Sequence, residues 1–103
     1  MRVKILGRWW RLRWTRQMQH RQAAAHRGQV IYGECDPPTI PKKEIRIRTG
    51  LSDETELEIL IHEMLHAANW HIDEEFVAKF SEDAARALTR VGFRKSGTGE
   101  GSR

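Results

Sequence analysis

The spacing of hydrophobic residues changes at Gly50, and this change constrains the fold more than any other feature of the chain. Before Gly50, apolar side chains recur at every second residue, as in RWWRLRW and EIRIRT. After Gly50, they recur at intervals of three and four residues. A period of two is typical of half-buried strands, and a period near 3.6 is typical of amphipathic helices. Strands followed by helices indicate an α+β fold.

We expect three short strands, at residues 8–14, 30–35 and 44–49, that form a small three-stranded sheet. The expected inward faces are Trp10, Leu12 and Trp14 in the first strand and Ile45 and Ile47 in the third. Residues 15–29 are polar and are expected to form a loop, with a helical turn near residues 23–25.

Two helices are expected after the sheet, one over residues 53–70 and one that starts at Asp73 and ends before Gly92. Ser52 or Asp53 can cap the first helix, because both side chains accept hydrogen bonds from free backbone N–H groups. The connection is so short that the helices should form an antiparallel pair. Their expected apolar stripes are Leu57, Leu60, Ile61, Met64, Leu65 and Ala68 in the first helix and Phe76, Phe80, Ala84, Ala87, Leu88 and Val91 in the second.

The size of the chain predicts a single domain, at residues 1–94, followed by a Gly/Ser-rich tail at 95–103 that we expect to be disordered. The only cysteine, Cys35, excludes an internal disulfide framework and a Cys-rich zinc ribbon. No apolar run reaches the roughly 20 residues of a membrane span, and no signal peptide is recognised at the N-terminus. A cytoplasmic protein without membrane contact is therefore expected.

The stretch HEMLH at residues 62–66 places two histidines four residues apart. Residues at i and i+4 lie on one face of a helix, so His62 and His66 can direct their imidazoles at one metal ion. Both lie roughly 130–170° from the centre of the expected apolar stripe, and so outside the core. Glu63 can act as a general base on water activated by zinc. The motif predicts a zinc metallopeptidase.

A catalytic zinc usually has three protein ligands, so a third ligand is needed. The start of the second helix should lie close to His66, and Glu74 is the favoured candidate there. Asp73 is expected to cap that helix, and Glu75 has an alternative role as a first-turn acid. The open alternatives to Glu74 are Glu75, Asp73, His71 and, with least support, Glu82.

The stretch ILIHEMLHAANW followed by DEEFV resembles the small HExxH zincin metallopeptidase domains called minigluzincins, and the HExxH helix of SprT-like proteins. It is similar in particular to small uncharacterised phage and bacterial proteins. The matching segments are 33–36, 45–47, 62–67 and 73–77. The resemblance implies zinc on the two histidines and a helix-borne glutamate, with Glu63 as the base. It also implies that the strand at 45–49 lies beside the cleft, where an extended peptide substrate adds as a further strand.

The N-terminal quarter is strongly basic, with eight Lys or Arg and no acid in residues 2–27, within a chain of net charge +4. In RWWRLRWTR the arginines alternate with tryptophans. This pattern fits a strand whose Trp10, Leu12 and Trp14 face the core, and it also fits nucleic-acid contact through the basic strand. The alternative function is therefore a basic, nucleic-acid-associated binding module with a structural or vestigial metal site.

Overall fold

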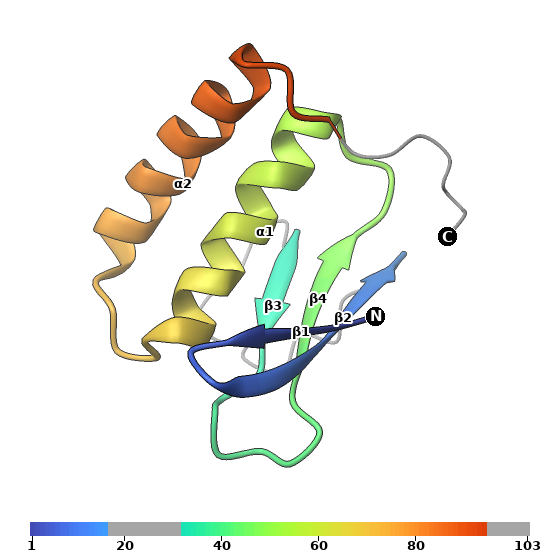
Figure 1. The fold of residues 1–103 in the computed structure, drawn as a ribbon, viewed down its shortest axis with the longest axis vertical. Helices are drawn as coiled ribbons and strands as arrows, with labels where there is room; N and C mark the ends of the chain where they lie inside the picture. The colour runs from blue at the N-terminus through green and yellow to red at the C-terminus, as the bar shows by residue number, and fades with distance from the viewer. Residues whose placement is uncertain (17–31, 95–103) are drawn as a thin grey trace, which may run out of the picture.

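The computed structural model describes residues 1–16 and 32–94, which form a four-stranded mixed sheet and two helices (Figure 1). The strands are β1 (Arg2–Ile5), β2 (Arg8–Thr15), β3 (Gly33–Cys35) and β4 (Glu44–Arg48), and the helices are α1 (Asp53–Ala68) and α2 (Glu74–Arg90). The expected α+β class is confirmed. The disordered tail predicted at 95–103, and most of the loop predicted at 15–29, lie outside the described residues.

The expectation of three strands is wrong, because β1 adds a fourth strand that pairs antiparallel with β2. The two strands are joined by Leu6 and Gly7, whose φ angles of 48° and 81° are both positive. Two positive φ angles characterise the two-residue hairpin turns that match the twist of a sheet. The alternation of Val3 and Ile5, which pack against the core, is the signal in the sequence for this strand.

The strand order is β1-β2-β4-β3, with β2 parallel to β4 and β3 antiparallel to β4. β4 is therefore hydrogen-bonded on both sides and has no free edge for a peptide. This corrects the expectation that the strand at 45–49 receives an extended substrate. β3 is the terminal strand on that side of the described sheet, and α1 packs against it.

The core lies between the sheet and α1, which crosses one face of the sheet (Figure 1). Trp10, Leu12, Ile45 and Ile47 are buried as expected, and Trp14 packs against them. The expected stripe of α1 is only partly correct. The residues of α1 in or against this core are the buried Ala67 and the partly buried Ile59, Leu60 and Met64. The other expected residues Leu57, Ile61 and Leu65 are also partly buried but are not part of this core.

The expected apolar stripe of α2 is wrong. α2 runs antiparallel to α1 and packs on it alone among the described elements, through the buried residues Val77, Ser81 and Ala85 (Figure 1). Phe76 and Phe80 are about half exposed and stack on each other with ring centroids 5.7 Å apart. The expected stripe of α2 was chosen from its largest apolar residues. The residues that are buried between the two helices are smaller ones, which let the helix axes come close together.

The face of the sheet opposite α1 carries a buried arginine, Arg46, whose side chain is only 2% exposed. Its guanidinium donates to Glu34, Asp36 and Glu44 at 3.1, 2.8 and 3.1 Å. Burial alone would lower the pKa of Arg46, but the hydrogen bonds to Asp36 and Glu34 raise it above its ordinary value. Because Glu34 lies on β3 and Glu44 on β4, this network joins the terminal strand to its neighbour.

Replacing Arg46 by methionine should lower the free energy of unfolding by about 3–5 kcal/mol, because it leaves buried carboxylates without their cation. Urea denaturation followed by circular dichroism measures this change. Arg11→Met is the matched control, since the Arg11 side chain is 62% exposed and its ion pair with Glu44 is 3.5 Å long. That control should lose about 1 kcal/mol or less. Equal losses in the two variants would contradict a special role for Arg46.

Candidate metal centre

α1 begins and ends at defined caps, which place residues 62–66 within its last three turns. Ser52 is the N-cap, and its hydroxyl accepts a hydrogen bond from the backbone N–H of Thr55 at 3.2 Å. Glu56 is buried on the sheet side and accepts a hydrogen bond from the indole N–H of Trp14 at 2.9 Å. This contact ties the first turns of α1 to β2.

α2 follows α1 after the short connection 69–73, and its first residue is Glu74. Asp73 is the N-cap, as expected, and its carboxylate accepts a hydrogen bond from the N–H of Phe76 at 2.8 Å. With the Asp73 side chain held at the helix end, the next residue, Glu74, projects from the first turn of α2 toward α1.

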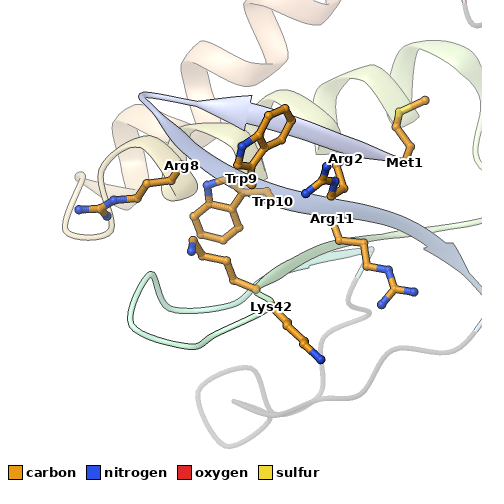
Figure 2. Close-up of a pocket in the computed structure, with 8 residues that line it drawn as sticks. Met1, Arg2, Arg8, Trp9, Trp10, Arg11 and Lys42 are labelled. Carbon is orange, nitrogen blue, oxygen red and sulfur yellow. The ribbon is translucent and has the colours of Figure 1, made fainter.

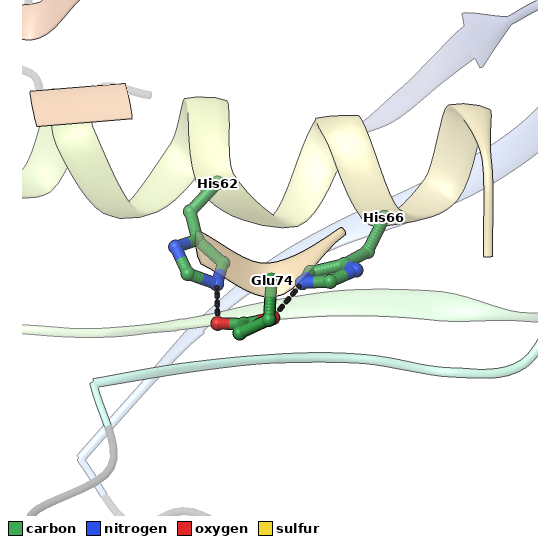
Figure 3. A group of neighbouring side chains, drawn as sticks. All are labelled: His62, His66 and Glu74. Carbon is green, nitrogen blue, oxygen red and sulfur yellow. Dashed lines mark ion pairs between the residues drawn. The ribbon is translucent and has the colours of Figure 1, made fainter. Parts of the chain in front are cut away.

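The carboxylate of Glu74 lies between the two histidines of α1 (Figure 3). His62 Nε2 is 3.1 Å from Glu74 Oε2, and His66 Nε2 is 2.8 Å from Glu74 Oε1. One ligand atom from each of the three residues lies within 4.8 Å of the others, and no other group of this kind is found in the described part of the chain. Two imidazole nitrogens and a carboxylate are the donor set of many catalytic zinc sites.

The surroundings of the cluster suit a metal ion that is open to solvent on one side. The side chains of His62 and His66 are 21% and 18% exposed, whereas that of Glu74 is 66% exposed. Burial lowers the pKa of His62, Glu74 raises it in part, and His66 lowers it further. The net direction favours a neutral imidazole, which is the form that binds a metal.

Glu63, the residue after His62, lies against the sheet, where it is only 8% exposed. Its side chain lies against Gly33 of β3: a Cβ atom at Gly33 would be 3.0 Å from Glu63 Oε2 and would collide with the Ile59 side chain. Glycine at this position therefore allows α1 to approach the terminal strand. An isolated glycine inside a strand often marks such a close approach, so GEC carried a signal that the sequence analysis did not use.

The environment of Glu63 favours its protonated form. Burial, followed by the charges of Glu74 and Glu34, raises the pKa of Glu63 from 4.5 to about 8, while Arg46 lowers it. A carboxyl group with a pKa near neutrality can both accept and donate a proton at physiological pH. Glu34, which the sequence analysis did not single out, contributes to this shift.

The other residues considered as third ligands lie outside the cluster. Asp73 caps α2, and Glu75 forms an ion pair with Lys79 at 3.2 Å on the surface. His71 is exposed, with its backbone N–H bound to the Asn69 side chain, and Glu82 pairs with Arg86 at 3.2 Å. Of the five candidate residues, only Glu74 lies beside the histidine pair in the structure.

Comparisons of the chain with protein-family models, with curated proteins and with solved structures find no match. The resemblance to zincin domains therefore remains an expectation from the sequence. Neither of the two described helices is long and apolar enough to cross a membrane.

Replacing Glu63 by glutamine should make the stability of the metal-free protein depend less on pH. Because the pKa of Glu63 is about 8 in the fold and 4.5 ordinarily, the folded state binds an extra proton between these values. Wild-type stability should therefore fall as pH rises from about 4.5 to 8. Glu63→Gln should melt several degrees above wild type at pH 8 and at a similar temperature near pH 4.5. Thermal melts with a chelator measure this, and parallel pH profiles for the two proteins would contradict the shift.

Proposed function

We propose that the protein is a zinc-dependent metallopeptidase that hydrolyses peptide bonds. The observation that carries this proposal is the meeting of His62, His66 and Glu74, with the buried Glu63 adjacent to the first histidine. The three donors would hold the ion, and zinc would supply Lewis acidity that polarises a substrate carbonyl and lowers the pKa of water. The sequence resemblance to minigluzincins supports the same assignment.

The residues of the chain would have separate roles in this reaction. Glu63 would take a proton from the attacking water and pass it to the leaving amine, which requires a carboxyl group that gains and loses a proton near neutral pH. Its side chain lies against Gly33 of β3. The exposed side of Glu74 leaves the cluster accessible to a substrate.

The terminal strand β3 offers the place for an extended peptide. β4 is paired on both sides, and the terminal strands of the described sheet are β1 and β3. Glu63 packs against β3, so peptide pairing beside it as a further strand would use the outer edge of β3. β3 begins at Gly33, which is also the residue against which Glu63 packs. A peptide along β3 would thus pass beside the proposed general base.

Zinc binding should depend on Glu74 and should not depend on its neighbour Glu75. We expect one zinc per chain in the wild type. Affinity should fall in Glu74→Gln by more than the roughly 10- to 100-fold typical of outer partners of a metal site. Glu75→Gln is the matched control, because Glu75 carries the same charge but pairs with Lys79 on the surface. Competition with a chromogenic chelator measures both. A wild-type protein without zinc affinity would refute the metal site.

Hydrolysis should depend on Glu63 even when zinc is retained. Glu63→Gln should keep the metal and lose about 100-fold or more of kcat, as expected for removal of a general base. His62→Ala should lose metal and activity together. A fluorogenic peptide library supplies the substrate for both measurements. If Glu63→Gln binds zinc and cleaves as fast as the wild type, the role assigned to Glu63 is wrong.

A further inference from the structure

A second candidate site lies far along the chain from the histidine cluster, where β1, the start of β2 and the loop before β4 meet (Figure 2). A cavity of about 560 Å³ opens there, within the size range of sites for small organic groups. Its lining includes five cationic side chains and an exposed indole: Arg2, Arg8, Arg11, Lys42, Lys43 and Trp9. No carboxylate is among the residues that line it.

The strand pairing places two of these cations, Arg2 and Arg11, on one face of the sheet, whereas Arg8 pairs with Ile5 and projects from the other face. Arg2 lies opposite Arg11, and Lys4 lies opposite Trp9, in the β1–β2 register. Directly opposed residues project from the same face of a sheet, and so do residues two apart in a strand. Arg2, Lys4, Trp9 and Arg11 therefore all project from the face opposite the apolar core.

Most of these cations have no acidic partner. Arg11 forms an ion pair of 3.5 Å with Glu44, whose carboxylate also binds Arg13 and Arg46. For Arg2, Arg8, Lys42 and Lys43, no carboxylate of the described residues lies within ion-pair distance. Uncompensated charges of one sign around a cavity raise the local concentration of anions.

Trp9 is the aromatic group of this cavity, and it is 48% exposed. The Arg2 guanidinium lies 4.6 Å and the Lys4 ammonium 5.5 Å from the centre of its ring. Trp10, Leu12 and Trp14 build the core without Trp9, so packing of the fold does not account for its position. A large exposed indole among cations can stack on a planar base while the cations hold phosphates.

Trp10 separates this cavity from the core. It is 1% exposed and also lines the cavity, and its indole N–H has no hydrogen-bond acceptor in the described part of the protein. An indole N–H is a donor only, and leaving a buried donor unpaired costs about 1–3 kcal/mol. The indole nitrogen has less than 1 Å² of accessible surface, so this unpaired donor belongs to the core and not to the open part of the cavity.

We propose that this cavity binds single-stranded nucleic acid, with a base stacked on Trp9 and the neighbouring phosphates held by Arg2 and Lys42. The site is separate from the histidine cluster, so the proposal of nucleic-acid binding does not depend on the proposed peptidase activity. It would bring a polyanion to the outer face of the sheet while α1 and β3 remain free to act on a peptide.

Binding of a fluorescent single-stranded oligothymidine to the full chain, followed by anisotropy over a range of salt concentrations, tests the proposal. Trp9→Ala should weaken binding about 10-fold, and Trp9→Phe should retain most of the affinity because its ring still stacks. The pair Arg2→Gln/Lys42→Gln should reduce the salt dependence of log K by roughly 0.7 for each lost phosphate contact.

The matched control is the pair Arg90→Gln/Arg94→Gln, which removes the same charge from α2 and the segment after it. α2 packs only on α1 among the described elements, so this pair should leave the salt dependence as in the wild type. The proposal is overturned if Trp9→Ala binds as tightly as the wild type, or if the control pair reduces the salt dependence as much as the site pair. Binding to anionic lipid vesicles in the absence of oligonucleotide binding would also overturn it.

Discussion

The fit of α1 against the sheet is the constraint on which the rest of the structure depends. Gly33 has no side chain, so Ile59 and Glu63 can lie against the terminal strand. At the other end of the contact, the carboxylate of Glu56 accepts the indole N–H of Trp14. These two contacts fix the rotation of α1 about its axis. With Glu63 turned to the sheet, His62 and His66 are left to meet Glu74 of α2.

Two neighbouring residues of α1, His62 and Glu63, thus have different surroundings. Glu63 is enclosed between α1 and β3, where burial and nearby carboxylates raise its pKa. His62 lies beside α2, where the carboxylate of Glu74 is largely exposed. A site with a buried proton acceptor and an open ligand cluster needs both neighbours of α1.

Charge is organised differently on the two parts of the outer sheet face. Around β3 and β4, Arg46 is surrounded by carboxylates and is almost completely buried. Its ion pairs hold these two strands together. Around β1 and the start of β2, the cations have few acidic partners and surround the exposed Trp9. The basic residues on this face of the sheet therefore include a structural arginine, Arg46, and a separate group of cations around Trp9 that can bind an anion.

The sequence by itself determined the α+β class, the inward faces of β2 and β4 and the Asp73 cap, because these depend on local periodicity and short spacings. It favoured Glu74 beside the histidines but left Glu75, Asp73, His71 and Glu82 as alternatives. Only the tertiary structure decided that β4 is internal and β3 terminal, that α2 packs through Val77, Ser81 and Ala85, and that Arg46 is buried. Strand order depends on which partners meet across the long connection between β2 and β3, and a periodic pattern does not encode that. The side of a helix that is buried depends on how closely its neighbours approach, as at Gly33, where the missing Cβ rather than any apolar stripe sets the position of α1.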